Sequence, residues 1–225
     1  MNNLLILMEA TTLFGEMNRS QRIDVANFGS IRSFGRGEFI ALHGENWPNL
    51  LLVMEGSIDV VKESADGRRL TLISLEPGDI FWGISFFGSG NEQPASFVTR
   101  GGCKICTWTT ENLLPYLINN GQELWALCQL MVKRMQQASQ IVEGLAFQQV
   151  ATRLARFILD LAGEEEQPSV SRDLTLDEIA SLVGSTREVV CRLLYRFAND
   201  NLIEITRTEF VLTDTQGLGR LATPG

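Results

Sequence analysis

The sequence predicts an α+β fold in three parts: an N-terminal antiparallel β-roll or jelly-roll barrel, a long helix, and a C-terminal helix-turn-helix followed by a β-hairpin. Three observations lead to this prediction. Short β-prone runs separated by turn residues recur between residues 31 and 108. An apolar stripe with helical spacing then extends from residue 124 to residue 145. Finally, two short amphipathic segments flank Gly184, and two β-prone runs follow them.

The composition is typical of a globular protein without a membrane segment. Of the chain's residues, 44% are hydrophobic and 20% charged, and its length of 225 residues allows one large or two ordinary domains. No apolar run is long enough to span a bilayer, and the apolar residues 4–8 lack the basic region of a signal peptide. The four cysteines are spread over the chain, which suggests a reducing compartment. We therefore expect a cytoplasmic protein with no membrane partner.

The barrel prediction rests on short β-prone runs that follow a mostly helical segment, residues 1–30. These runs are 31–34, 39–42, 50–54, 58–62, 70–75, 80–82, 95–99 and 104–108. Turn signals such as Gly44-Glu45-Asn46, Asp66-Gly67 and Pro77-Gly78-Asp79 separate them. Many short strands at regular spacing are typical of a small antiparallel sandwich or barrel, which commonly holds one small ligand or none.

From residue 111 the hydrophobic period becomes helical. Residues 111–119 predict a short helix, and residues 149–162 an amphipathic one. Between them, residues 122–143 predict a long helix with an apolar stripe close to a heptad repeat: Leu124, Leu127, Met131, Met135, Ala138, Val142 and Leu145. We expect this stripe to pair with a second copy of the chain in a homodimer; the alternative is that it packs only against its own barrel. The expected domains are residues 1–120, a dimerisation helix at 121–146, and residues 147–225.

Residues 174–201 have the pattern of a helix-turn-helix. Capping boxes at Thr175 with Glu178 and at Ser185 with Glu188 predict two helix starts, and Gly184 between them suits a helix end with positive φ. The outer face of the second helix then carries Arg187, Glu188, Cys191, Arg192, Tyr195 and Arg196. The β-prone runs 202–206 and 210–213 follow at hairpin spacing, as in the winged variety that binds DNA. A small helical hairpin with a solvated charged face is the plainer alternative.

The net charge of −8 argues against general affinity for nucleic acid. Within the second helix, however, Arg187, Arg192 and Arg196 outnumber Glu188. A local basic face on an acidic chain is compatible with a site-specific reader of double-stranded DNA.

In this order the three parts resemble the Crp/Fnr family of bacterial transcription regulators, over nearly the whole chain. The resemblance rests on four stretches: GSTREVVCRLL at 184–194, LAFQQVATRLARFILDLA at 145–162, LLLVMEGSIDVV at 50–61 and LEPGD at 75–79. It implies a homodimer whose recognition helices enter successive major grooves of a pseudo-palindromic DNA site. RNA polymerase is a candidate further partner.

The resemblance also names the expected DNA contacts. The family's base readers fall on Arg187, Glu188 and Arg192, and their side chains suit guanine and cytosine edges. Ser185 and Thr186, at the helix N-terminus, are expected to meet phosphate, and Arg196 completes the set. Glu188 has an alternative role in the capping box or in an ion pair with Arg192.

The expected effector pocket departs from that of the cyclic-AMP-binding relatives. Aligned on LEPGD, their ribose-binding Gly-Glu falls on Trp82-Gly83, their phosphate-binding Arg-Ser on Gln93-Pro94, and their adenine-binding Thr-Ser on Ala138-Ser139. Burying a phosphate without a cation is costly, so cyclic AMP is disfavoured. An apolar or aromatic ligand, haem, or a filled pocket without an effector all suit the expected lining: Trp82, Gly83, Ser85, Phe86, Gln93, Pro94, Ala95, Met135, Ala138 and Ser139.

We predict neither catalytic residues nor a metal centre. An enzyme on such a barrel would need several histidines or a carboxylate cluster for a metal, and His43, in a turn, is the single histidine. Cys103 and Cys106 have metal-like spacing, yet residues three apart on a strand face opposite sides, so one is expected to pack in the core. Haem stays open because methionine and cysteine also ligate iron. A transcription regulator with an unidentified effector is therefore predicted; a regulatory module acting on another protein is the alternative.

Overall fold

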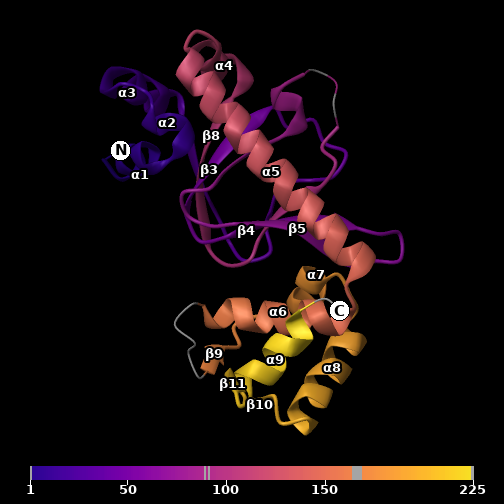
Figure 1. The fold of residues 1–225 in the computed structure, drawn as a ribbon. Coiled ribbons are helices and arrows are strands. Elements are labelled where there is room, and N and C mark those ends of the chain that lie inside the picture. Colours follow the sequence, from indigo (N-terminus) through magenta and orange to yellow (C-terminus); the bar gives the residue numbers. More distant parts are fainter. Residues whose placement is uncertain (1, 89, 91, 164–168, 224–225) are drawn as a thin grey trace. The chain divides into compact units, whose positions relative to one another are not determined.

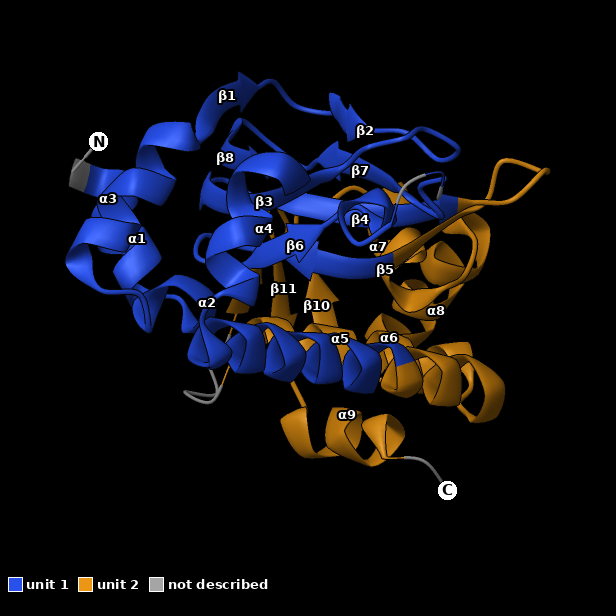
Figure 2. Cartoon of the chain, turned by 90° about the horizontal axis from the view of Figure 1, so that it is seen from above, with its two compact units in different colours: residues 1–62, 72–138 blue, residues 63–71, 139–225 orange. Residues whose placement is uncertain are grey.

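Figure 1 shows the fold of the chain in a computed structural model, which describes residues 2–88, 90, 92–163 and 169–223. The chain forms two compact units, residues 1–62 with 72–138 and residues 63–71 with 139–225 (Figure 2). The elements that the structure describes are helices and antiparallel sheets, which confirms the predicted α+β class. None of the described helices is both long and apolar enough to cross a membrane.

The first unit begins with three helices, as predicted for residues 1–30: α1 (Asn2–Ala10), α2 (Thr12–Gly15) and α3 (Arg19–Phe28). The Thr11 hydroxyl caps α2 by accepting from the Phe14 N–H, and Asn18 with Gln21 forms a capping box at the start of α3. The apolar sides of these helices pack into one core with the strands and helices that follow.

All eight predicted strands form, each within about two residues of its expected bounds: β1 (Ser30–Phe34), β2 (Phe39–Ala41), β3 (Asn49–Glu55), β4 (Ile58–Glu63), β5 (Arg69–Leu75), β6 (Ile80–Trp82), β7 (Ser96–Thr99) and β8 (Cys103–Thr109). They make two four-stranded sheets, ordered β1-β8-β3-β6 and β2-β7-β4-β5. The pairs β1–β8, β3–β8, β3–β6, β2–β7 and β4–β7 are antiparallel.

Strands β3 and β8 carry buried side chains on both faces, which explains the continuous apolar run Leu50–Val53 in β3. Leu51, Val53 and Ile105 enter one core, with side chains from the second sheet. Leu50, Leu52 and Trp108 point the other way, into the core shared with the N-terminal helices and with α4 (Thr110–Ile118). Alternate residues of one strand therefore stabilise two separate apolar clusters.

The long helix α5 (Gly121–Phe147) is longer than the predicted 122–143. Its last turn is stabilised by Arg153, whose guanidinium donates to the carbonyls of Gly144 and Gln148. The Gly144 carbonyl also accepts from the Gln148 N–H at 3.1 Å, so Arg153 is a second donor at this helix end. A contact from a residue nine positions further on is not part of the local pattern that predicts 122–143; the expected dimerisation helix, 121–146, ends one residue before α5 does.

The exposed stripe of α5 differs at one position from the predicted one. Leu127 is buried in the core of its own unit, so its assignment to the stripe was wrong. Cys128 is exposed in its place. The corrected stripe, with spacings that alternate between four and three, is Leu124, Cys128, Met131, Met135, Ala138, Val142 and Leu145.

The second unit contains α6 (Val150–Ala162), β9 (Ser169–Ser171), α7 (Leu176–Val183), α8 (Arg187–Asn199), β10 (Ile203–Ile205), β11 (Glu209–Leu212) and α9 (Thr215–Ala222). The predicted helix-turn-helix and hairpin are confirmed, and β9 adds a third strand in the order β10-β11-β9. Neither β9 nor α9 was predicted. The two glycines of α9 lower its helix propensity, so the sequence did not predict this helix. The helix is stabilised by its Asp214 cap and by the fully buried Leu218.

Candidate nucleic-acid interface and effector pocket

The first helix of the helix-turn-helix begins as predicted. The Thr175 hydroxyl accepts from the Glu178 N–H at 3.2 Å, and the Glu178 carboxylate accepts from the Thr175 N–H at 2.6 Å. At the other end, Gly184 has φ +65°, and a Cβ on it would lie 2.6 Å from Leu145 Cδ2. The positive φ therefore favours glycine in this turn, and a larger residue would also require the flexible Leu145 side chain to move.

The second predicted capping box was wrong. The N-cap of α8 is Thr186, one residue later than expected, and its hydroxyl accepts from the Val189 N–H at 3.4 Å. Glu188 is consequently the second residue of the helix, one position too early to complete a capping box with the actual cap, Thr186. The predicted alternative role of Glu188 as a capping-box partner is thereby excluded.

Removing the caps tests this assignment. Thr175→Ala is expected to destabilise the helix-turn-helix by about 1 kcal/mol, and Thr186→Ala by somewhat less because its hydrogen bond is longer. Ser185→Ala is the matched control, and it should change the stability by less than about 0.3 kcal/mol. Hydrogen exchange of the α7 and α8 amides measures the effect. A loss of protection in Ser185→Ala as large as in Thr186→Ala would contradict the N-cap at Thr186.

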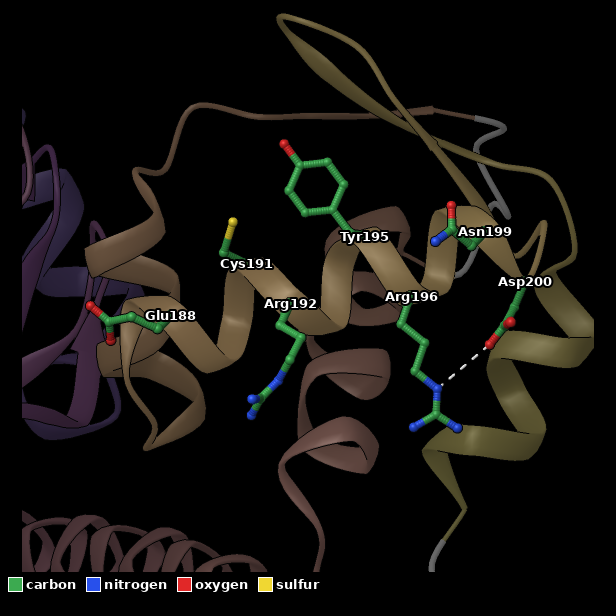
Figure 3. Close-up of a pocket in the computed structure, with 7 residues that line it drawn as sticks. All are labelled: Glu188, Cys191, Arg192, Tyr195, Arg196, Asn199 and Asp200. Atoms are coloured by element: carbon green, nitrogen blue, oxygen red, sulfur yellow. Dashed lines mark ion pairs between the residues drawn. The ribbon is translucent and has the colours of Figure 1, made fainter.

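One face of α8 is buried and the opposite face is exposed. Val190, Leu194 and Phe197 pack in the core of the second unit. Figure 3 shows the outer face, with Arg192 and Arg196 extending from one side of the helix and Cys191 and Tyr195 from the other. An open groove of about 730 Å³ follows this face, lined by Glu188, Cys191, Arg192, Tyr195, Arg196, Asn199 and Asp200.

The charged groups on this surface differ in their partners. Arg187 pairs with Asp177 at 3.3 Å and Arg196 with Asp200 at 3.7 Å, and all four side chains are exposed. Across the described part of the chain, no carboxylate forms an ion pair with Arg192, so the predicted alternative pair with Glu188 is not formed. The Glu188 pKa is lowered, first by its own backbone N–H, then by the Thr186 hydroxyl, with Arg187 nearby. Its carboxylate is therefore an acceptor at neutral pH.

Ser185 and Thr186 precede the first turn of α8 and are partly exposed. With Arg187, Glu188, Arg192 and Arg196, all six residues predicted to contact DNA lie on or next to one helix. Tyr195 and Asn199 extend the same surface and were not among the predicted contacts. Tyr195 is four residues after Cys191 and Asn199 four residues after Tyr195, and this spacing already indicates their position on one face of a helix.

In the first unit, Gly83 explains why a carboxylate is missing from the expected pocket. A Cβ on Gly83 would lie 2.0 Å from the backbone oxygen of Trp47 and 2.9 Å from its ring. No side chain fits at this position while Trp47 keeps its place. Sequence reasoning did not identify Trp47, because the loop that carries it is far from Gly83 in sequence.

The rest of the expected pocket in the first unit is closely packed. Gln93 is buried, and its side-chain oxygen accepts from the Ile84 N–H at 3.2 Å in a short 3₁₀ turn (Ile84–Phe86). Ser85, Phe86 and Ala95 are buried and Pro94 is exposed. Aromatic rings pack beside them: Phe81 stacks on Trp82 at 5.4 Å, and Phe97 meets both Phe81 and Trp47 edge-on. Met135, Ala138 and Ser139 lie exposed on α5.

Sequence reasoning also missed a buried cation, Arg134 of α5. Its Nη2 lies 3.1 Å from Asp79 Oδ1 and donates to the Ile80 carbonyl, and its guanidinium lies over the Phe81 ring at 5.6 Å. The spacing of seven from Leu127 places Arg134 on the buried side of the helix, which is the signal that was available. Because Asp79 balances its charge, Arg134 is not a free cation for a phosphate.

Among the described residues, neither the pair Cys103 and Cys106 nor His43 belongs to a potential metal site. Cys103 and Cys106 face opposite sides of β8, as predicted, but both are buried, in different cores. Burial raises the pKa of Cys103 to about 11, with Glu76 contributing, and that of Cys106 to about 12, so both stay protonated thiols. His43 is exposed in its turn. The described residues include no group of three or more potential metal ligands.

Comparison with known proteins agrees with this architecture. The chain matches the cyclic nucleotide-binding domain over residues 31–120 and the Crp-like helix-turn-helix domain over residues 152–221. The CRP-like cAMP-activated global transcriptional regulator of Mycobacterium tuberculosis is 27% identical over 194 residues, which cover 84% of this chain and 86% of that protein.

Solved structures of other proteins have the same fold. A crp/fnr family regulator from Eubacterium rectale has a TM-score of 0.77 at 21% identity, covering 93% of this chain and 97% of the other. The c-di-GMP responsive global regulator CLP of Xanthomonas campestris has a TM-score of 0.76 at 22% identity, covering 88% and 100%. With both domains matched in the order of the fold, the chain belongs to the Crp/Fnr family of transcription regulators, which bind DNA through this helix-turn-helix and are not enzymes.

Proposed function

We propose that this chain is a homodimeric transcription regulator that reads a pseudo-palindromic DNA site through Arg187, Glu188 and Arg192. The observation that carries the proposal is the outer face of α8, where exposed arginines and an ionised carboxylate stand opposite a fully packed inner face. Arginine can bind guanine O6 and N7 with two hydrogen bonds, and a carboxylate can accept from cytosine N4. Ser185, Thr186 and Arg196 are the proposed phosphate contacts.

The proposed dimer uses the corrected stripe of α5. Met135 and Val142 are each 66% exposed in the isolated chain, although both are apolar and lie in the middle of a long helix. Apolar residues whose spacing alternates between four and three are typical of two helices packed in parallel. A two-fold axis along this helix pair would present two copies of α8, as a palindromic site requires.

Selection from random duplexes tests the proposal directly. We expect enrichment of an inverted repeat whose half-sites are about one helical turn apart, 10 to 11 base pairs from centre to centre. Enrichment of no sequence, or of a single half-site, would contradict the proposed function. Binding in the cytoplasm to a promoter would then bring RNA polymerase into reach as a further partner.

The selected duplex allows the base readers to be tested one by one. Arg187→Ala and Arg192→Ala are each expected to weaken binding by about 10- to 100-fold, and each should relax the preference at one base pair per half-site. Arg220→Ala is the matched control, since it removes one exposed arginine from α9 of the same unit. Fluorescence anisotropy on the selected duplex and its single-base variants measures both effects. A uniform loss over all variants would indicate phosphate contacts instead.

We propose that the effector is not cyclic AMP. Gly83 leaves no room for a ribose-binding carboxylate, Gln93 is engaged with the Ile84 N–H, and the charge of Arg134 is balanced by Asp79. The names of two relatives support a ligand that varies between members, since one is cAMP-activated and the other c-di-GMP responsive. The aromatic cluster around Phe81 favours an apolar or aromatic ligand, haem, or no ligand at all.

Titration calorimetry checks this expectation. Cyclic AMP added to the protein should give only heats of dilution, because a buried phosphate would lack a free cationic partner. The selected duplex, titrated into the same preparation, is the control that the protein is active. Saturable binding of one cyclic AMP per chain would overturn the proposed exclusion.

A further inference from the structure

Asp177 places an acidic side chain in the first turn of α7, in the unit that is proposed to bind DNA. It is the second residue of α7, directly before Glu178, whose carboxylate is used in the capping box with Thr175. Among the residues that the structure describes, Arg187 is the one ion-pair partner of Asp177, at 3.3 Å between Nη1 and Oδ2. A carboxylate in the first turn of α7 thus forms an ion pair with the first arginine of α8.

This pair has little to do with folding. Arg187 is 60% exposed and Asp177 69% exposed, and ion pairs in such surroundings contribute little to stability. Its effect must be sought in the orientation of the guanidinium and in the local electrostatic field. The first helix of a helix-turn-helix crosses the DNA backbone, where its N-terminus would ordinarily attract phosphate. Asp177 places a negative charge at this point.

We propose that Asp177 is a specificity-determining residue: it holds the Arg187 guanidinium available for a base edge and repels the phosphates of non-cognate DNA. The proposal rests on the proposed function, because it assigns a role to Arg187 in reading DNA. Asp177 itself need not contact a base for this role.

DNA can satisfy the hydrogen-bond donors of Arg187 in two ways. On any duplex, a flexible arginine can turn to the nearest phosphate, and such contacts supply most of non-specific affinity. Asp177 opposes this by pairing with the guanidinium and by repelling the same phosphates. On a cognate site, two hydrogen bonds to guanine compensate for the repulsion. Asp177 therefore weakens both complexes, but the non-specific complex more.

The test replaces Asp177 by asparagine, which keeps the size of the side chain and removes its charge. Asp177→Asn is expected to tighten binding to a random-sequence duplex by about five-fold at moderate salt. The slope of log K against log salt should become steeper by about one. Binding to the selected site should tighten by less than about two-fold, so the specificity ratio falls. The preference at the base pair read by Arg187 should relax as well.

Two further variants make the result specific. Asp160→Asn removes the same charge from α6, where no ion pair with the recognition helix exists in the described structure, and it should leave the specificity ratio unchanged. In an Arg187→Ala background, Asp177→Asn should still tighten random-duplex binding but no longer alter any base preference.

The outcomes separate the two proposals. If Asp177→Asn bound both duplexes more tightly by the same factor, Asp177 would act only through its charge on any DNA, and the inference would be overturned. Unchanged binding of Asp177→Asn to both duplexes would also overturn it, with the proposed function intact. If the wild-type chain enriches no site at all, the proposed function fails and the inference falls with it.

Discussion

Replacing Met135 by glutamate should convert the proposed dimer into monomers and weaken binding to the selected duplex by at least about 100-fold. Met135 lies in the middle of the exposed stripe of α5, and a parallel helix pair would bring its two copies face to face. Two carboxylates would then be buried against each other without a cation. Because Met135 is 66% exposed in the isolated chain, the substitution should leave the fold of each chain unchanged.

The control for this variant is Gln140→Glu, on the same helix but outside the stripe. Gln140 is exposed, so this change adds the same charge without entering the proposed interface. Sedimentation velocity at micromolar concentration should give dimers for the wild type and for Gln140→Glu, and monomers for Met135→Glu. A dimeric Met135→Glu protein, or a monomeric wild type, would contradict the proposed helix pair.

The stripe also shows how far local periodicity can be used. Spacings of three and four predicted the long helix and most of its exposed apolar residues. They could not distinguish Leu127 from Cys128, since neighbouring positions on a helix differ by only 100° and the barrel covers one of them. Only the packing of Leu127 into the core of the first unit decides which of the two is exposed.

Hydrogen bonds to the backbone set a second limit to prediction. Thr175 and Glu178 were recognised as a capping box because the whole motif is local. At α8 the same motif was present in sequence, yet the helix starts one residue later, at a cap on Thr186. Gly184, Ser185 and Thr186 are all residue types that are common at helix boundaries, so the boundary is hard to place from sequence. In the structure, Gly184 forms the turn with positive φ, and Thr186 is the cap.

The expected effector pocket was the least predictable part of the chain. From the sequence, we expect the nucleotide-binding residues of the cyclic-AMP-binding relatives to be replaced at Trp82-Gly83 and Gln93-Pro94. What occupies their surroundings depends on contacts between distant segments, such as Trp47 against Gly83 and Arg134 against Asp79. Such contacts follow from the packed fold, and no local pattern encodes them.

The pair between Asp79 and Arg134 leads to the second large effect. Asp79→Asn should destabilise the first unit by about 2 to 3 kcal/mol, at the lower end for a broken buried pair because Asp79 is partly accessible to water. The amide can still accept from the Glu76 N–H, which Asp79 does at 3.0 Å, so the turn keeps its hydrogen bond. What is lost is the counter-charge of an arginine whose side chain is only 8% exposed.

Removing the other partner should be milder. Arg134→Met leaves the Asp79 carboxylate, which water can reach, and it replaces the guanidinium over Phe81 by an apolar side chain of similar length. We expect a loss of about 1 kcal/mol. The double variant Asp79→Asn with Arg134→Met should then be more stable than Asp79→Asn alone, because no buried charge remains unpaired.

Urea unfolding followed by tryptophan fluorescence can measure this cycle for the first unit alone. All four tryptophans, at positions 47, 82, 108 and 125, belong to that unit. If Arg134→Met proved as destabilising as Asp79→Asn, the contact with Phe81 and the hydrogen bond to the Ile80 carbonyl would stabilise the buried guanidinium more than its counter-charge does. If the expected order holds, Asp79 is what keeps a cation of α5 next to the aromatic cluster. A ligand that displaced Phe81 would then act on α5 through this pair, within one unit.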